Sequence, residues 1–260
     1  MELHYKTFGE GQPLLILHGL FGSSDNWLTL GRKLAEQYKV YLIDQRNHGR
    51  SPWSNDWNYQ LMAEDLLEFV KTHELEDFIL VGHSMGGKTA MNFAARYYPS
   101  KVQKLVVVDI APKPYRVHHD TIVEGLNALD LSQINSRKEA DDQLAQYVEE
   151  AGVRMFLLKN LYRPKGGENE AKKFDWRINL SVIGNNLVNV SDGLAENLQY
   201  DGQTLFVRGV NSNYIKESDE TLIKKHFPNA TLQSVEQAGH WIHAEKPQEF
   251  LEMLLNFIQN

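Results

Sequence analysis

The chain has 260 residues, of which 42% are hydrophobic and 23% charged, a balance typical of one globular unit that buries a sizeable core. Its formal net charge of −7 disfavours a large nucleic-acid surface, because phosphate binding needs clustered lysine and arginine, and it disfavours a broadly basic membrane-binding face. The absence of cysteine excludes disulfides, thiolate nucleophiles and cysteine-based zinc sites.

The first residues lack the charged-then-apolar layout of a secretory signal, and no apolar stretch in the sequence reaches membrane-spanning length. We therefore expect a cytoplasmic protein without a membrane span and without a nucleic-acid partner. We expect a monomer or a homodimer, because nothing in the composition decides between them.

Short apolar runs alternate with helical patterns through the first 111 residues. After an edge hairpin over residues 3–8, buried strands are expected at 14–17, 40–43, 78–81 and 105–108. The helices between them are expected at about 27–38, 59–71 and 85–98. This alternation predicts an α/β fold with a mostly parallel sheet that helices cover on both faces.

The alternation stops after Asp109. Residues 112–198 are polar and helical in pattern, with helices expected over about 119–129, 137–149, 153–161 and 176–185. Core elements return as strands at 204–207 and 231–235 and as a last helix over 247–258. We therefore expect a core built from residues 1–111 and 199–260, interrupted by a helical cap at 112–198.

The most informative segment is Gly82-His83-Ser84-Met85-Gly86, which directly follows the strand expected at 78–81. Small residues two before and two after a serine suit a sharp strand-to-helix turn, because larger side chains would collide there. Such a turn holds the serine in a strained conformation with its hydroxyl exposed. This nucleophile elbow predicts that Ser84 is the nucleophile of an acyl-transfer hydrolase.

The same stretch also fits the phosphate-loop pattern G-x-x-x-x-G-K-[ST] over residues 82–89. A phosphate loop usually follows the first core strand, whereas two expected core strands precede this one. A nucleotide-binding NTPase would also leave the loops at His18-Gly19 and Gly239-His240 without a role. Nucleotide hydrolysis is therefore the remote alternative.

His240 is the expected general base. It lies in the loop between the last strand and the last helix, which reaches the same carboxyl edge of the sheet as Ser84. An imidazole titrates near neutrality, so it can take and return a proton. His243 competes for this role, but the adjacent glycine and the loop position favour His240.

The acid that would orient this histidine is less obvious. The segment 209–214, after the penultimate strand, contains no carboxylate. Glu217 and Asp219 come late enough to begin a helix, where acids stabilise the first turn. Asp109 ends the strand next to the one that carries the serine, at an edge that also faces the histidine loop. The position of Asp109 therefore allows it to be the acid.

Five motifs in the correct order make the whole chain resemble the α/β-hydrolase superfamily. They are His18–Ser23, Asp44–Ser51, Gly82–Gly87, Val108–Pro112 and Gly239–Trp241. Within the superfamily, the chain is most similar to the YbfF-type bacterial esterases and acyl-CoA thioesterases and to the ABHD11-like hydrolases. This resemblance implies an eight-stranded, mostly parallel sheet with a helical cap inserted after the sixth strand.

The resemblance also implies roles for single residues. The YbfF-type esterases carry their acid in the same Asp-Ile-Ala-Pro motif and a serine after the seventh strand. This implies Asp109 as the orienting acid and Ser212 as an auxiliary hydrogen-bonding partner of His240. The backbone N–H groups of Leu20 and Met85 would form the oxyanion hole. Such a mechanism needs no metal and no organic cofactor.

Three more residues are candidate substrate contacts. Phe21, with Leu20 and Met85, would line an apolar acyl pocket, while Tyr115 and Arg116 follow the acid at the entrance of the cap. Arg116 suits a negatively charged leaving group such as a CoA phosphate, and it equally suits an ordinary solvated surface. We therefore expect a serine hydrolase that cleaves short- to medium-chain carboxylic esters or acyl thioesters. A ligand receptor of the same fold with slow turnover is the alternative.

Overall fold

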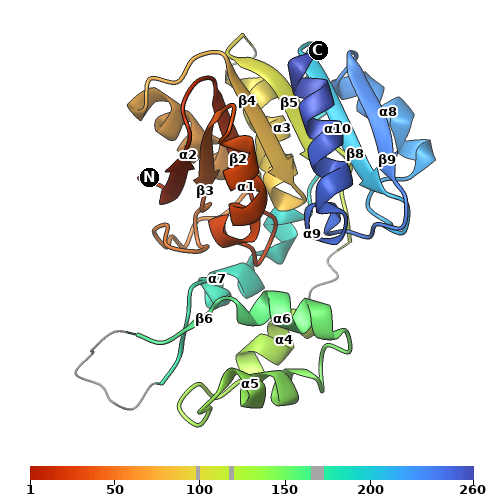
Figure 1. Cartoon of the computed structure of the whole chain (residues 1–260). Helices are drawn as coiled ribbons and strands as arrows, with labels where there is room; N and C mark the ends of the chain where they lie inside the picture. Colours follow the sequence, from red (N-terminus) through yellow and green to blue (C-terminus); the bar gives the residue numbers. More distant parts are fainter. Residues whose placement is uncertain (98–99, 117–119, 165–172) are drawn as a thin grey trace.

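The computed structural model describes residues 1–97, 100–116, 120–164 and 173–260. Their main sheet has seven strands in the order β1-β3-β2-β4-β5-β8-β9, and only β1 runs antiparallel to its neighbour (Figure 1). The strands are β1 (Tyr5–Phe8), β2 (Pro13–Leu17), β3 (Lys39–Ile43), β4 (Phe78–His83), β5 (Val102–Val108), β8 (Gln203–Gly209) and β9 (Ala230–Val235). This mostly parallel sheet confirms the expected α/β fold.

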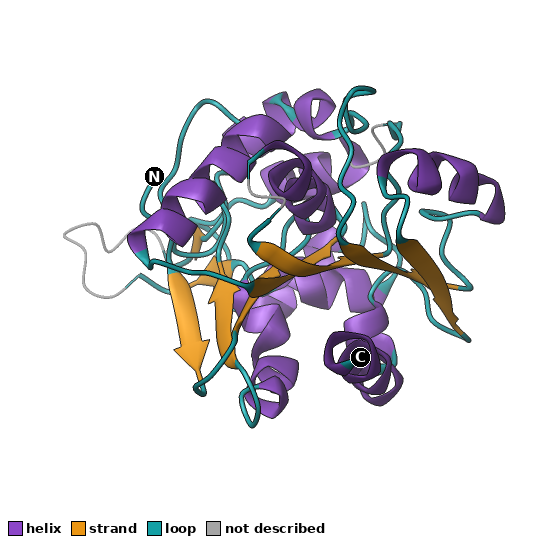
Figure 2. Cartoon of the chain, turned by 90° about the horizontal axis from the view of Figure 1, so that it is seen from above, coloured by secondary structure: helices purple, strands orange, loops and turns teal. Residues whose placement is uncertain are grey.

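Helices cover both faces of this sheet (Figure 2). On one face lie α1 (Leu28–Leu34) and α10 (Pro247–Gln259), and on the other lie α2 (Tyr59–Thr72), α3 (Met85–Arg96) and α8 (Glu220–His226). Successive side chains of β2 alternate between the two cores, because strand side chains point to opposite faces. The central strands are therefore apolar throughout, which is why they stand out in the sequence.

The expected edge hairpin is a single strand, so the described sheet has seven strands rather than eight. The residues before β1 bind the loop after β3 instead. The carbonyl of His4 accepts from Asp44 N at 2.9 Å, and His4 N donates to Ser51 Oγ at 2.8 Å. Because these backbone groups are already paired with the loop, they do not add another strand to the sheet edge.

The chain leaves the sheet after β5 and returns at β8, and we call the intervening residues 112–198 the cap segment. Its described elements are α4 (Asp120–Ala128), α5 (Arg137–Leu144), α6 (Ala151–Leu158), β6 (Leu161–Tyr162), β7 (Asp175–Trp176), α7 (Leu180–Asn185) and the 3-10 helix η2 (Leu187–Val190). The helix expected from residue 176 begins later, because Trp176 pairs with Leu161 in a two-stranded ladder. Residue 119, the expected start of the first cap helix, lies outside the described residues.

Hydrogen bonds join the two ends of the cap segment to each other, and an apolar cluster packs it on the core. The chain segments that leave and re-enter the core pair with each other, since Tyr115 N donates to Ser191 O at 2.8 Å and Leu194 N donates to Pro112 O at 2.9 Å. An apolar cluster also joins the cap helices to the core. Its buried members include Leu126, Leu157 and Ile183 from the cap segment and Phe21, Trp57 and Met85 from the core. No helix within the described ranges is long and apolar enough to cross a membrane.

Candidate active site

Ser84 stands at the turn between β4 and α3 with a backbone φ of +52°. The turn is tight: a Cβ atom on Gly82 would lie 2.3 Å from Gly86 O, and one on Gly86 would lie 2.5 Å from Leu17 O. No larger residue fits at either position without moving the backbone. A non-glycine residue at positive φ costs about 1–3 kcal/mol, so the surrounding packing must hold the serine there.

His240 reaches Ser84 from the loop between β9 and α9 (Ile242–Glu245). Its Nε2 atom lies 3.0 Å from Ser84 Oγ, and its Nδ1 atom lies 2.7 Å from Asp109 Oδ2. Since Nδ1–H donates to the carboxylate, the Nε2 lone pair faces the serine hydroxyl. The arrangement can therefore remove a proton from Ser84 and return it to a leaving group.

Asp109 lies at the end of β5, fully buried, and adopts a φ of +50°. Its Oδ1 atom accepts from Gly209 N at 3.1 Å, and its Oδ2 atom accepts from both His240 Nδ1 and the Ser212 hydroxyl. Ser212 therefore contacts the carboxylate and not the imidazole, which corrects the expected hydrogen bond to His240. Three donors surround this buried carboxylate, as a buried charge requires.

The two competing carboxylates point elsewhere. Asp219 accepts from Lys113 Nζ at 2.5 Å and from Lys216 N at 2.8 Å, while the exposed Glu217 pairs with Arg208 Nη2 at 3.3 Å. Both sit at the start of a helix, as their spacing indicates. Of the three carboxylates considered, only Asp109 contacts the histidine.

His243, the competing base, is buried against Trp27, with ring centroids 4.1 Å apart and ring planes 9° from parallel. Burial lowers its pKa to about 3, so the ring is neutral. Burial also holds the pKa of His83 well below its ordinary value, and the neutral His83 donates from Nε2 to the carbonyl of His240 at 2.8 Å. These two rings support the loop that carries His240.

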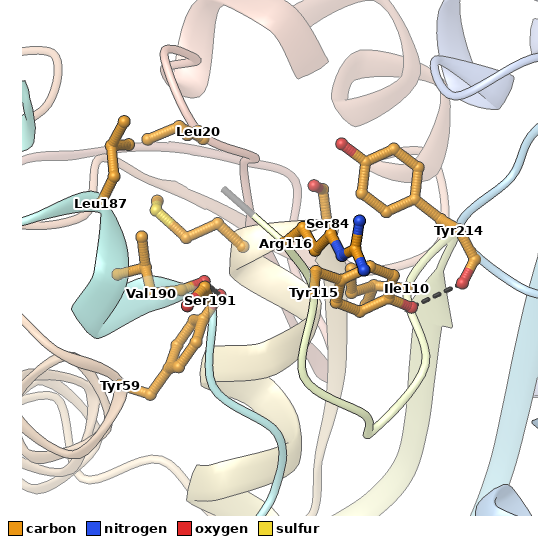
Figure 3. Close-up of a pocket in the computed structure, with 11 residues that line it drawn as sticks. Leu20, Tyr59, Ser84, Ile110, Tyr115, Arg116, Leu187, Val190, Ser191 and Tyr214 are labelled. Carbon is orange, nitrogen blue, oxygen red and sulfur yellow. Dashed lines mark hydrogen bonds between the residues drawn. The ribbon is translucent and has the colours of Figure 1, made fainter. Parts of the chain in front are cut away.

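Tyr214 is a site residue that the sequence analysis missed. Its ring stacks on the His240 ring, with centroids 4.0 Å apart and planes at 19°. Tyr115 secures this segment: its hydroxyl donates to Tyr214 O at 2.5 Å (Figure 3). The same hydroxyl accepts from Ala111 N at 2.8 Å. The hydroxyl of Tyr115, an expected substrate contact, is therefore occupied by protein, and only its ring faces the pocket.

The expected oxyanion donors flank Ser84. Gly19 and Gly22 close a turn through a 3.0 Å hydrogen bond, and a Cβ atom on Gly19 would lie 3.2 Å from Ser84 Cβ. Leu20 N lies within this turn, and Met85 N begins α3, where backbone N–H groups lack helical partners. Neither N–H has an acceptor within the part of the chain that the structure describes.

Two cavities meet at Ser84. The narrow one, of about 50 Å³, is lined by Leu20, Tyr59, Ser84, Met85, Ile110, Tyr115, Arg116, Leu187, Val190, Ser191 and Tyr214 (Figure 3). The wide one, of about 610 Å³, opens toward α4 and α6, and its walls include Phe21, Phe156, His240 and Trp241. Phe21 therefore faces the wide cavity rather than the pocket it was expected to share with Met85. Arg116 is exposed at the edge of the narrow cavity.

The phosphate-loop residues serve a different purpose here. Lys88 is buried, and its Nζ atom donates to the carbonyl of Lys113 at 2.5 Å and to that of Asp192. Thr89 Oγ1 donates to Gln45 Oε1 at 2.8 Å. Both side chains thus bind the protein itself: Lys88 binds the two ends of the cap segment, and Thr89 binds the loop after β3. Within the described ranges, no group of three or more histidine, aspartate or glutamate side chains is placed to hold a metal ion.

Comparison with known proteins agrees with the α/β fold described above. A family model described as alpha/beta hydrolase fold matches residues 12–143. The sn-1-specific diacylglycerol lipase ABHD11 of Mus musculus is 38% identical, over 94% of this chain and 80% of the relative. Esterase YbfF of Escherichia coli K12 is 35% identical, over 95% of this chain and 93% of the relative. A solved structure titled marine microorganism esterase has a TM-score of 0.93 and 44% identity, and the match covers 98% of this chain and 99% of that one.

The buried neutral histidines predict a loss of stability in acid. In the unfolded chain His243 binds a proton below its ordinary pKa of 6.5, whereas in the folded protein it stays neutral down to about pH 3. The free energy of unfolding therefore falls as the pH is lowered through this range. His243→Phe keeps the ring stack on Trp27. It should reduce the slope of unfolding free energy against pH by up to about 1.4 kcal/mol per pH unit between roughly pH 4 and 6.

Chemical denaturation at several pH values measures this slope. His73→Phe is the control, because His73 is only partly buried and its pKa is lowered less. An unchanged slope in His243→Phe would show that His243 is protonated in the native state.

Proposed function

The chain belongs to the α/β-hydrolase family and is a hydrolase of the esterase or lipase type, and we propose that it cleaves carboxylic esters through a triad of Ser84, His240 and Asp109. The observation that carries this proposal is the unbroken hydrogen-bond chain from Ser84 Oγ through His240 to Asp109, with distances of 3.0 and 2.7 Å. The strained serine supports the same chemistry, and so do the N–H groups of Leu20 and Met85, which have no acceptor among the described residues.

In the proposed first half-reaction, Ser84 Oγ attacks the ester carbonyl carbon while His240 Nε2 takes the hydroxyl proton. The carbonyl oxygen becomes an oxyanion, which the N–H groups of Leu20 and Met85 bind. Each such donor contributes about 10²- to 10³-fold to the rate in comparable hydrolases. As the tetrahedral intermediate collapses, the bond to the alcohol oxygen breaks and His240 gives that oxygen its proton.

In the second half-reaction, His240 removes a proton from water, and the hydroxide attacks the acyl-serine ester. The acid product leaves, and Ser84 recovers its proton. Asp109 fixes the imidazole tautomer and stabilises the imidazolium formed in both steps. The Ser212 hydroxyl and the Gly209 N–H hold the carboxylate in place, so Ser212 acts through Asp109 in this mechanism.

The need to deliver a proton to the leaving group indicates which part of the substrate lies in each cavity. The leaving group must meet His240 Nε2 to receive its proton, so it occupies the wide cavity, whose walls include His240 and Trp241. The acyl chain must then lie in the narrow cavity, whose lining does not include His240. A space of about 50 Å³ admits only a short chain, whereas about 610 Å³ accommodates a large alcohol. The proposed substrates therefore combine a short acyl group with a bulky leaving group.

An acyl thioester is the second candidate substrate, because the same attack on the carbonyl carbon by Ser84 and the same proton return by His240 would cleave it. Arg116 does not favour a phosphate-bearing leaving group such as CoA, since it lies exposed at the edge of the narrow cavity, on the acyl side of Ser84 in this assignment. We also propose that residues 112–198 act as a cap that selects the substrate, over a core formed by residues 1–111 and 199–260.

The nucleophile assignment predicts the result of covalent labelling. A fluorophosphonate probe should modify wild-type protein at Ser84, and Ser84→Ala should lose both the label and ester turnover, because the attacking oxygen is gone. Peptide mapping by mass spectrometry locates the label. A label at another residue would overturn the assignment, and a labelled Ser84 without measurable turnover would favour a receptor of this fold.

The acid assignment predicts a large effect of an isosteric change. Asp109→Asn should lower kcat by roughly 10⁴-fold, because an amide at this position favours the wrong imidazole tautomer. Glu217→Gln is the matched control and should remain near wild-type activity, since Glu217 is exposed and pairs with Arg208. An active Asp109→Asn variant together with an inactive Glu217→Gln variant would move the acid to Glu217.

The cavity assignment predicts chain-length selection. With p-nitrophenyl esters, kcat/KM should drop at least tenfold from butyrate to octanoate. Leu187→Ala, which enlarges the narrow cavity, should shift the optimum to longer chains by about fourfold per accommodated methylene, the equivalent of about 0.8 kcal/mol. The neighbouring Val188 is 62% exposed and lines neither cavity, so Val188→Ala should leave the profile unchanged. A wild-type optimum at octanoate would place the acyl chain in the wide cavity instead.

A further inference from the structure

The turn that carries Leu20 contains a strained residue. Phe21 is the third residue of the turn closed by Gly22 N and Gly19 O, and it adopts a φ of +58°. A turn with positive φ at this position ordinarily takes glycine, because a side chain costs energy in the left-handed region. Phe21 cannot leave its place freely, since its ring is buried. The surrounding structure must therefore hold the backbone in this conformation.

Two side chains hold the backbone of Phe21 from opposite sides. From the core, His48 Nε2 accepts the Phe21 N–H at 3.3 Å while its Nδ1–H donates to Arg46 O at 2.9 Å. From the cap segment, Asn160 Nδ2 donates to the Phe21 carbonyl at 2.7 Å. The first bond fixes the peptide before Phe21, and the second fixes the peptide after it.

Asn160 is itself firmly placed, between α6 and β6, and is 4% exposed. Its side-chain amide donates to both Phe21 O and Leu157 O, the latter at 3.1 Å, so both of its N–H bonds are used. Its backbone N donates to Leu157 O at 3.1 Å, and its carbonyl accepts from Arg177 N at 2.8 Å. A carboxylate of the same shape would instead direct an oxygen at two carbonyls, so asparagine is required at this position.

We propose that Asn160 is a positioning residue for the oxyanion hole: by holding the Phe21 carbonyl, it keeps the turn in the conformation that directs the Leu20 N–H toward the substrate oxygen. This inference rests on the proposed function, which makes Leu20 N an oxyanion donor. It adds a residue of the cap segment to the catalytic geometry. The cap is then required for rate as well as for selecting the substrate.

The physical reason is the relation between neighbouring peptides. Asn160 binds the oxygen of the Phe21–Gly22 peptide, and the N–H of that same peptide donates to Gly19 O, which belongs to the peptide that carries the Leu20 N–H. Without the Asn160 bond, Phe21 can relax toward negative φ, the Phe21–Gly22 peptide tilts, and the Gly19–Leu20 peptide moves with it. The Leu20 N–H then moves away from the position it needs beside Met85 N. An oxyanion donor works only when it is already aimed at the developing charge, and a displacement of about 1 Å costs on the order of 10²-fold in rate.

Other contacts between the cap segment and the core bypass this turn, which provides a matched control. Asn179 Nδ2 donates to Asn47 Oδ1 at 3.1 Å, and Asn179 is 9% exposed, similar to Asn160. Asn179→Asp and Asn160→Asp each remove one amide donor between cap and core without changing side-chain size. Only the second change removes a hydrogen bond made directly to the oxyanion turn.

The test compares kcat, KM, thermal stability and the affinity for a trifluoromethyl ketone, whose adduct with a serine carries an oxyanion. Asn160→Asp should lower kcat roughly 10- to 100-fold with KM within about threefold, and affinity for the ketone should fall in parallel. Asn179→Asp should lose stability to a similar extent but keep kcat within about threefold. Asn160→Gln retains the donor on a longer stem and should recover part of the rate.

Two results would overturn the proposal. The first is an Asn160→Asp variant that loses stability but keeps wild-type kcat and ketone affinity, which would make Asn160 a purely structural contact. The second is an equal loss of kcat in Asn179→Asp, which would assign the effect to general docking of the cap. Both results leave the proposed function intact, because wild-type turnover dependent on Ser84 is established separately by covalent labelling.

Discussion

The close approach of Gly82 to Gly86 is the constraint on which the site depends. It allows β4 to turn directly into α3, and it holds Ser84 at a positive φ with its hydroxyl at the carboxyl edge of the sheet. Strand order positions the other site residues, because β5 and β8 follow β4 in the sheet. Their ends deliver Asp109 and the loop of Ser212 to the same edge, where the loop after β9 brings His240. Residues far apart in sequence therefore meet because parallel strands end together.

Neutral histidines form the support around this centre. His48 and His243 have pKa values lowered to about 3 by burial, and burial also lowers the pKa values of His18 and His83. His48 and His83 use a ring nitrogen to bind the backbone at Phe21 and at His240, and His18 Nε2 accepts from Gln45 N in the loop after β3. A neutral imidazole offers one donor and one acceptor, so it can join two segments where a lysine or carboxylate could not. These rings also make the folded protein less stable in acid, since each binds a proton in the unfolded chain at a pH at which it stays neutral in the folded protein.

Much of this architecture was predictable because its signals are local. Apolar runs marked the central strands, and glycine spacing marked the elbow. Errors arose where distant contacts override local pattern. Trp176 looks helical but pairs with Leu161, and the residues before β1 bind the loop after β3 instead of forming a hairpin. The hydrogen bond from Ser212 to Asp109 and the stacking of Tyr214 on His240 depend on loop conformation, which no spacing rule reveals. The role of Tyr214 could not be predicted from the sequence, because a single aromatic residue after a strand is ordinarily part of the core.

The central claim is that Ser84 carries the acyl group during turnover, and trapping that intermediate tests it most directly. A p-nitrophenyl dimethylcarbamate forms a carbamoyl-serine that water releases slowly, so the adduct can be mapped by mass spectrometry after rapid quenching. We expect one carbamoyl group per chain, attached to Ser84, with release of p-nitrophenol in equal amount. Turnover of p-nitrophenyl esters accompanied by an unmodified Ser84, or a carbamoyl group on any other residue, would contradict it.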